Sequence, residues 1–137
     1  MMVNMTLRSL VLFFTFQFPM AFAGPAEVAR EALDHQAIWF DSASGALTIL
    51  ATSRDTVSKG QLATSILLGY CDSVIGDSHV MDRVKKVNVI NSSRTHGFVF
   101  FGGIDTCDEI SGEEYLDDKE IAEIILSHSV VWTGKNF

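Results

Sequence analysis

The sequence predicts an α+β domain with an antiparallel sheet, and three observations support this. Runs rich in strand-forming residues occur in pairs between helical patterns, in the order helix, two strands, helix, two strands, helix, strand. Turn-forming clusters separate the strands of each pair, which predicts two hairpins. The regular alternation of one strand with one helix, typical of a parallel sheet, is missing. We therefore expect about three helices packed on two hairpins in a single domain.

Residues 1–23 have the layout of a cleavable signal peptide. Arg8 precedes an apolar run at 10–16, and the small-residue site Ala21-Phe22-Ala23 follows. The run is shorter than the roughly 20 apolar residues that a membrane-spanning helix needs. We expect a periplasmic or secreted domain of residues 24–137 without a membrane span once the signal is removed. An uncleaved membrane anchor is the alternative.

Local patterns predict the first helix and the first hairpin. Pro25 suits a first helical position, and apolar residues continue at helical spacing to about His35. Strand-forming residues at 37–41 and 45–52 flank a turn-like cluster at 42–45.

The second helix is predicted from about Ser58 to about Val74. Ser58 and Gln61 resemble a capping box, and a broad apolar stripe follows. Gly60 and Gly69 each cost roughly 1 kcal/mol relative to alanine in a helix. Tertiary packing must therefore hold this helix, and a polar segment at 75–83 follows it.

A second hairpin is predicted from strands at 84–90 and 95–101 around the turn 91–94. Both faces of the later strand are apolar, so we expect it to be central in the sheet. Residues 102–107 are predicted to form a turn. The chain is then expected to end with a helix capped by Asp117 and a short strand at 130–132.

Cys71 and Cys107 are the two cysteines of the chain. In an exported protein such a pair predicts one disulfide, which would tie the second helix to the sheet and contribute roughly 4 kcal/mol. Two unpaired buried thiols are the alternative. The chain has no Cys-x-x-Cys, so the sequence supports neither a redox enzyme nor a zinc site built on cysteines.

Negative charge is concentrated in residues 105–123, which hold nine acidic side chains and one lysine, whereas the rest of residues 24–137 is neutral in sum. Charge of one sign steers an oppositely charged partner, so a basic protein surface is the expected partner. A solvated loop and helix start is the structural alternative. The candidate partner-binding residues are Asp105, Asp108, Glu109, Glu113, Glu114, Asp117 and Asp118.

Other chemistries have little support in the sequence. The chain has no glycine-rich phosphate loop, and an acidic domain is repelled by nucleic acid. The four histidines lie in separate segments, and the acidic spacing does not match a calcium-binding EF-hand loop. We therefore expect no metal, no cofactor and no nucleic-acid partner. Asn91-Ser-Ser93 matches the N-glycosylation pattern, and its use depends on the source.

The first functional hypothesis is a non-enzymatic exported interaction module, such as an inhibitor, immunity or accessory protein. Its acidic segment would bind a basic partner protein. The alternative is a small hydrolase or ligand-binding domain with a site near Asp77 and His79. An envelope component that associates through sheet edges is the third hypothesis.

Overall fold

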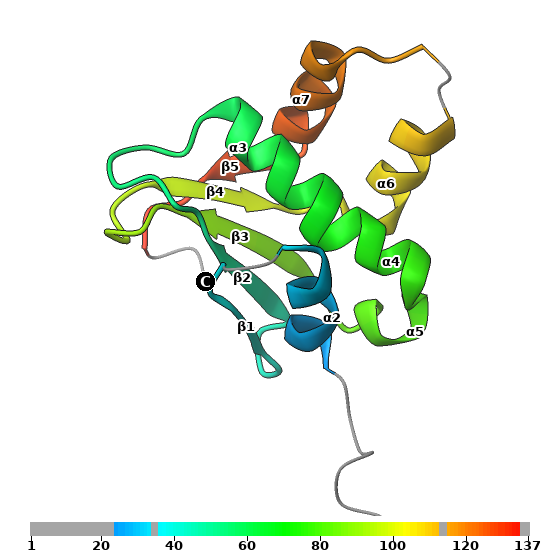
Figure 1. Cartoon of the computed structure of the whole chain (residues 1–137), viewed down its shortest axis with the longest axis horizontal. Helices are drawn as coiled ribbons and strands as arrows, with labels where there is room; N and C mark the ends of the chain where they lie inside the picture. Colours follow the sequence, from blue (N-terminus) through cyan, green and yellow to red (C-terminus); the bar gives the residue numbers. More distant parts are fainter. Residues whose placement is uncertain (1–23, 34–35, 113–114, 135–137) are drawn as a thin grey trace, which may run out of the picture.

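A five-stranded sheet organises the molecule, which a computed structural model describes at residues 24–33, 36–112 and 115–134. The strands lie in the order β1-β2-β3-β4-β5. The helices cover one face of this sheet (Figure 1). The predicted α+β class is confirmed, as one small domain with one disulfide.

Both predicted hairpins are present. β1 (Ile38–Asp41) pairs antiparallel with β2 (Ala46–Leu50), and β3 (Lys86–Ile90) pairs antiparallel with β4 (Gly97–Phe100). β5 (Ser129–Val131) adds to the other side of β4. β4 therefore has a neighbour on each side, as its two apolar faces indicated.

The sheet is mixed, so the expectation of a wholly antiparallel sheet is wrong at one place. β2 and β3 run parallel, with Leu47 opposite Val87 and Ile49 opposite Val89. Parallel neighbours need a long crossover connection, and the helical segment between the two hairpins supplies it. Turn residues fix the direction of strands inside each hairpin, but they do not fix how one hairpin is oriented against the other.

A continuous helix at residues 59–76, the crossover helix, connects β2 to β3. It consists of α3 (Lys59–Thr64), a π-helical part η1 (Ser65–Cys71) and α4 (Asp72–Gly76). The predicted capping box starts it: Gln61 N donates to Ser58 Oγ at 3.1 Å, and Ser58 N donates to Gln61 Oε1 at 3.0 Å. The helix continues two residues beyond the predicted end.

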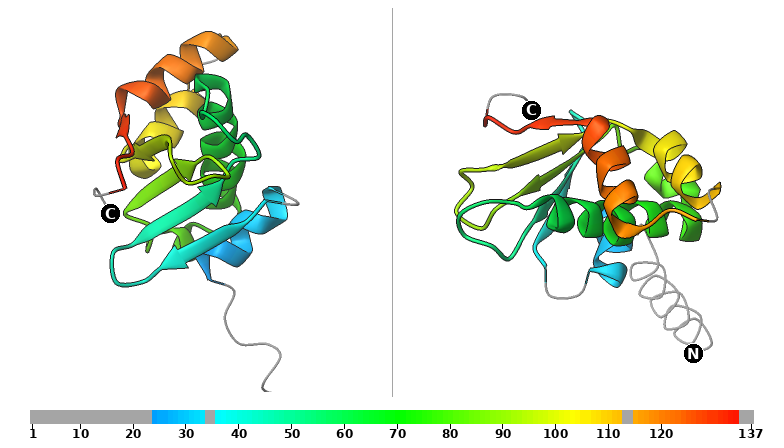
Figure 2. Two further views of the ribbon diagram at one scale, coloured as in Figure 1. Left: turned by 90° about the vertical axis from the view of Figure 1, so that its left-hand side faces the viewer. Right: turned by 90° about the horizontal axis from the view of Figure 1, so that it is seen from above.

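The other helices in the described part of the chain are α2 (Pro25–Ala32), α5 (Ser78–Met81), α6 (Gly103–Gly112) and α7 (Asp118–Ser127). Figure 2 shows them, with the crossover helix, on the same side of the sheet. The predicted end of the first helix at His35 lies outside the described residues. The core between the two layers contains side chains that are at most 2 % exposed: Ile38, Leu47, Ile49, Val87, Val89 and Phe100 from the sheet, and Leu62, Ile66, Tyr70 and Ile125 from the helices.

The predicted turn at 102–107 is wrong, because α6 occupies most of it. Gly103 has a φ of +63°, which glycine adopts readily, and the chain turns there from β4 into α6. Ile104, Cys107 and Ile110 then follow at three-residue spacing and pack against the core. The prediction stopped at Cys107 and so missed this apolar face.

Asn91 fastens the turn of the second hairpin to the loop before the crossover helix. Its side chain is buried, and its Nδ2 donates to the carbonyl oxygens of Arg54 and Asp55 at 2.8 and 2.9 Å. Its Oδ1 accepts from the backbone N–H groups of Thr95 and His96. A glycan on Nδ2 would have to break this network, so the fold disfavours glycosylation of the folded protein.

Replacing Gly60 or Gly69 of the crossover helix with alanine should change the free energy of unfolding in opposite directions. A Cβ at Gly60 would meet only Ser58 Oγ, at 3.9 Å, whereas one at Gly69 would lie 2.5 Å from Leu33 Cδ1 and 2.9 Å from Ile49 Cδ1. We expect Gly60→Ala to raise the free energy of unfolding by about 0.5–1 kcal/mol. Gly69→Ala should lower it by about 1 kcal/mol, because overpacking outweighs the helical gain. Urea unfolding measures both, and equal stabilisation by the two variants would contradict the packing described above.

Candidate functional site

The predicted acidic residues lie on α6 and on the start of α7. Asp105, Asp108 and Glu109 are exposed on α6, and Asp117 and Asp118 are exposed at the beginning of α7. Glu113 and Glu114, which precede Tyr115 in the connection between these helices, lie outside the described residues. Two helices thus carry the candidate residues that the structure describes.

Some of these carboxylates already have a structural partner. Asp117 is the N-cap of α7, and its Oδ1 accepts from Glu120 N at 2.7 Å. Glu123 Oε1 lies 3.3 Å from Lys59 Nζ, which joins α7 to the crossover helix. Glu109 Oε2 lies 4.0 Å from His128 Nε2.

Other carboxylates have no such partner. Within the described part of the chain, no cation lies within ion-pair distance of four exposed carboxylates. They are Asp105, Asp108, Asp118 and Glu120. Charges of this kind remain available to an external cation, and these four residues of α6 and α7 are called the acidic face below.

The disulfide holds α6 in place. Cys71, at the end of η1, is bonded to Cys107 of α6, with 5.4 Å between their Cα atoms, so the predicted pair is confirmed. Both cysteines are buried. The bond ties one helix to another and not a helix directly to the sheet, because Cys107 lies in α6 and not in a turn.

Removing the disulfide should loosen α6 first. We expect the double variant Cys71→Ala/Cys107→Ala to lower the free energy of unfolding by about 2–4 kcal/mol in urea. In hydrogen exchange, amides of α6 should lose more protection than those of β3, which is held on both sides by strands. Equal loss of protection in α6 and β3 would show that the bond stabilises the fold without specifically anchoring α6.

Tyr70 is buried in the core, near Asp82 and Asp105. Its ring packs edge-on against Phe100, with 6.0 Å between ring centroids, and its side chain is 1 % exposed. Burial raises the pKa of the Tyr70 phenol to about 12, and the negative charges of Asp82 and Asp105 add to this. The neutral phenol is therefore the form that the folded protein favours.

This shift predicts a loss of stability at alkaline pH. The folded pKa of about 12 lies above the ordinary 10.0, so the folded state holds the proton longer than the unfolded state. The stabilisation that comes from the protonated Tyr70 phenol is complete below pH 10 and is lost between about pH 10 and 12. We expect the stability difference between wild type and Tyr70→Phe to change by about 2 kcal/mol over this range in favour of the variant. Parallel pH profiles of the two proteins would contradict the shift.

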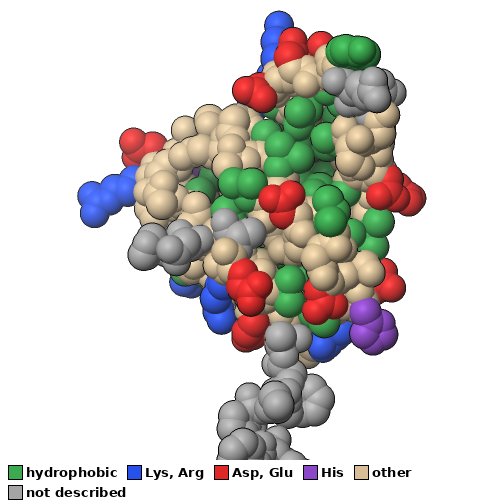
Figure 3. Space-filling model, turned by 45° about the vertical axis from the view of Figure 1, so that its right-hand side comes forward, with side chains coloured by type: hydrophobic (Ala, Val, Ile, Leu, Met, Phe, Trp, Pro, Cys, Tyr) green, Lys and Arg blue, Asp and Glu red, His purple; other side chains and the backbone are tan. Residues whose placement is uncertain are grey.

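A groove of about 240 Å³ lies between the crossover helix and α7. Its walls contain Gly60, Ala63, Thr64 and Leu67 from the crossover helix, and Asp118, Ile121 and Ala122 from α7. Figure 3 shows this side of the molecule, where hydrophobic side chains line a hollow and acidic side chains lie around it. Asp118 thus belongs both to the acidic face and to the groove.

A wider depression of about 530 Å³ also borders α7. It is lined by Leu116, Asp117, Lys119, Glu120, Glu123 and Ile124. Three of these six side chains are acidic and one is basic. α7 therefore presents carboxylates beside both of its hollows.

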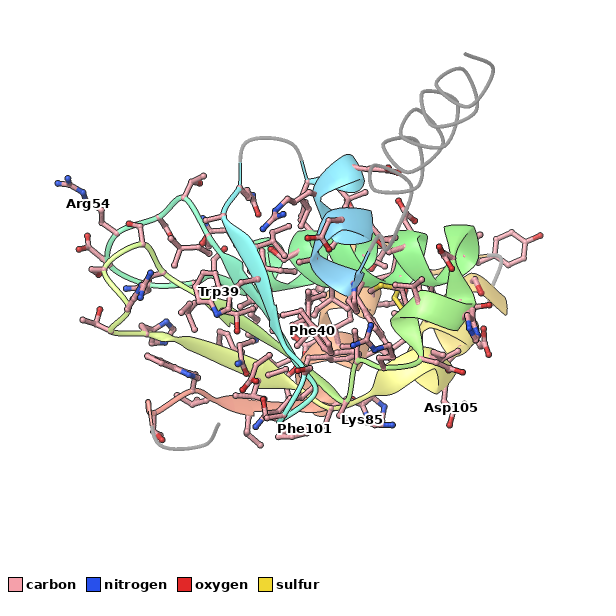
Figure 4. All side chains as sticks on the ribbon, turned by 90° about the horizontal axis from the view of Figure 1, so that it is seen from below. Trp39, Phe40, Arg54, Lys85, Phe101 and Asp105 are labelled. Carbon is pink, nitrogen blue, oxygen red and sulfur yellow. A yellow bond between two sulfur atoms is a disulfide. The ribbon has the colours of Figure 1, made fainter. Side chains whose placement is uncertain are left out.

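The arginines and lysines elsewhere serve other parts of the fold. Arg83 lies over the ring of Phe40 at 5.4 Å, and Arg94 lies over Trp39 at 5.3 Å. Figure 4 shows Arg54 at the opposite end of the molecule from Asp105. In the same view Lys85 lies toward the same end as Asp105, so positive and negative side chains are not separated into two ends of the molecule.

The alternative site near Asp77 and His79 receives no geometric support. Asp77 is the N-cap of α5, and its Oδ1 accepts from Val80 N at 3.3 Å. His79 is exposed on that helix. Neither residue lines the groove or the depression, or a further cavity of about 360 Å³ beside the crossover helix. That cavity is lined by Gln36, Ala51, Thr52, Ser58, Gly60, Gln61, Thr64 and Ser65, none of which titrates.

The described histidines and acids do not gather into a metal site. His96 Nδ1 accepts from Val57 N at 3.0 Å, which ties the second hairpin to the loop before the crossover helix. Among residues 24–33, 36–112 and 115–134, no three His, Cys, Asp or Glu side chains are grouped closely enough to hold a metal ion.

Sequence reasoning identified the charge but missed the groove. Gly60, Ala63, Thr64 and Leu67 recur at one-turn spacing and form one helix face, which was the available signal. Ala63 and Leu67 also belong to the broad apolar stripe that predicts this helix, and that pattern indicates burial. Only the packing of α7 beside them shows that they line a hollow.

Comparisons of this chain with protein-family models, with curated proteins and with solved structures found no match. In the described part of the chain, no helix is both long and apolar enough to cross a membrane. The acidic face and the groove are therefore the features from which a function can be inferred.

Proposed function

We propose that this protein is a non-enzymatic exported interaction module, such as an inhibitor, immunity or accessory protein, whose acidic face binds a basic partner protein. The observation that carries the proposal is the groove lined in part by Asp118, beside carboxylates that have no cation within ion-pair distance among the described residues. An apolar centre with a polar rim is the usual anatomy of a protein interface.

Electrostatics explains what the acidic face contributes. Exposed carboxylates without a nearby cation raise the rate at which a basic partner is captured, and salt weakens this effect. Exposed ion pairs add little affinity by themselves, about 0–1 kcal/mol each. Charge therefore selects and orients the partner, while apolar contacts supply more of the binding energy.

An exported location is part of the proposal. A disulfide in a small domain fits an oxidising compartment, since such bonds rarely persist in the cytosol. The expected signal peptide at residues 1–23 gives a route to that compartment. The partner is then expected in the periplasm or outside the cell.

Neutralising the acidic face should abolish partner capture. The test variant carries Asp105→Asn, Asp108→Asn, Asp118→Asn and Glu120→Gln. The control removes the same number of exposed charges elsewhere, through Glu31→Gln, Asp55→Asn, Asp72→Asn and Asp82→Asn. Each protein is immobilised and exposed to the periplasmic or secreted fraction of its own cells, and bound proteins are identified by mass spectrometry.

We expect wild type and the control to retain the same basic protein and the test variant to lose at least about nine-tenths of it. Sodium chloride at several hundred millimolar should release it, because the Debye length then falls to a few ångströms. Identical capture by all three proteins, or capture insensitive to salt, would overturn the proposal. Thermal unfolding of the three proteins verifies that all are folded.

A further inference from the structure

A cavity of about 360 Å³ lies where the loop after β2 meets the start of the crossover helix (Figure 1). Its described lining consists of Gln36, Ala51, Thr52, Ser58, Gly60, Gln61, Thr64 and Ser65. Gln36 precedes β1, Ala51 and Thr52 follow β2, and the others belong to the cap and the first turns of the crossover helix. The residues of the acidic face are not among them, so this cavity is separate from the proposed partner-binding surface.

The side chain of Gln36 brings an unsatisfied acceptor to this cavity. Its Oε1 atom is enclosed and accepts no hydrogen bond from the described part of the chain. An enclosed amide oxygen without a donor costs free energy, because it has lost its hydrogen bonds to bulk water. A molecule in the cavity that donates a hydrogen bond to this oxygen would remove the cost.

Ser65 lines the same cavity with a hydroxyl group that has no partner among the described residues. The residue is 4 % exposed. Serines inside helices often donate to a carbonyl oxygen one turn earlier, and Ser73 of the same helix does so, to Gly69 O at 2.9 Å. Ser65 makes no such bond, so its hydroxyl remains available both as a donor and as an acceptor.

Three further polar side chains add hydrogen-bonding groups to the lining. Thr52 and Thr64 are exposed, and their hydroxyls form no hydrogen bond within the described ranges. Gln61 Oε1 accepts from Ser58 N at 3.0 Å and from Ser53 Oγ at 3.2 Å, which leaves the Nε2 amide as a donor. Hydroxyl and amide groups from three separate segments therefore converge on one cavity.

None of the described lining residues carries a charge. An anion would lie against the Gln36 oxygen without a cation in the lining, and a cation would find no carboxylate there. Either charge would therefore be poorly compensated. A hydroxyl group of a neutral ligand, in contrast, can donate to Gln36 Oε1 and accept from the Ser65 hydroxyl. The lining favours a neutral ligand rich in hydroxyl groups.

The volume of about 360 Å³ sets the size of this ligand. Pockets that enclose a small molecule commonly measure roughly 300–1,000 Å³, so this cavity is at the lower end of the range. A single sugar ring or cyclic polyol suits such a space, whereas a longer oligosaccharide would extend into solvent.

We propose that the cavity at the start of the crossover helix binds a neutral, hydroxyl-rich small molecule of the size of a monosaccharide. Gln36 Oε1 accepts a hydrogen bond from one ligand hydroxyl, and the Ser65 hydroxyl bonds to another. Thr52 and Thr64 supply further hydrogen bonds from exposed positions. This site goes beyond the proposed function, and the two can fail separately because they share no acidic residue.

The test titrates isotope-labelled protein with three neutral probes, glucose, N-acetylglucosamine and myo-inositol, and follows the amide resonances by NMR. Gluconate and inorganic phosphate are the charged probes. We expect at least one neutral probe to bind saturably with a Kd of about 1 mM or lower. The resonances that shift should be those of Thr52 and residues 58–65, while those of α6 stay unchanged.

Two variants remove the proposed ligand contacts. Gln36→Met and Ser65→Ala should each weaken binding of the neutral probe by about fivefold to tenfold, because each deletes one hydrogen bond. Neither variant should lower the thermal unfolding temperature, since neither group has a partner in the described structure. Ser73→Ala is the matched control, because it removes a buried serine hydroxyl of the same helix that does not line the cavity. It should bind the probe as the wild type does.

The inference fails if no neutral probe shifts these resonances at concentrations far above that Kd, or if both cavity variants bind like the wild type. Tighter binding of gluconate or phosphate would assign the cavity to an anion instead. A crystal structure of probe-soaked protein that shows only water in the cavity would likewise overturn the inference. Partner capture through the acidic face is measured independently, so these outcomes leave the proposed function to its own test.

Discussion

The parallel pairing of β2 with β3 is the constraint on which the rest of the structure depends. It forces the chain to cross from one end of the sheet to the other, and the crossover helix makes this connection. Leu47, Ile49, Val87 and Val89 of this strand pair face that helix and are at most 1 % exposed. The central pair and the helix therefore share one core, and neither could be buried without the other.

The acidic face is built outward from this unit. Disulfide bonding to Cys71 fixes α6 on the crossover helix, and the Lys59–Glu123 pair connects α7 to the other end of the same helix. The candidate binding surface is thus held by the disulfide and by packing against the crossover helix. These contacts keep the carboxylates of α6 and α7 in a defined arrangement, although the two helices have no separate core.

Local signals in the sequence predicted the structural features that depend on residues close to one another in the chain. The capping box of Ser58, both hairpins, the cap formed by Asp117 and the pairing of the two cysteines all follow from residue type and spacing. The relative direction of the hairpins did not, because it depends on packing between β2 and β3. α6 was missed for a related reason: it has no capping signal comparable with Ser58, and only contact with the core shows that Ile104 and Ile110 share a face.

The same difference between local signals and tertiary packing explains which features of the candidate site the sequence predicts. Clustered charge can be counted in a sequence, so the acidic residues can be predicted without the fold. A groove exists only between two elements, and Gly60, Thr64 and Ala122 are small residues that carry no chemical signature. Their smallness becomes meaningful where the crossover helix and α7 lie side by side, because each missing methylene leaves space that a partner can fill. Specific recognition by this protein is then expected to depend on shape at the groove, with charge deciding which molecules reach it.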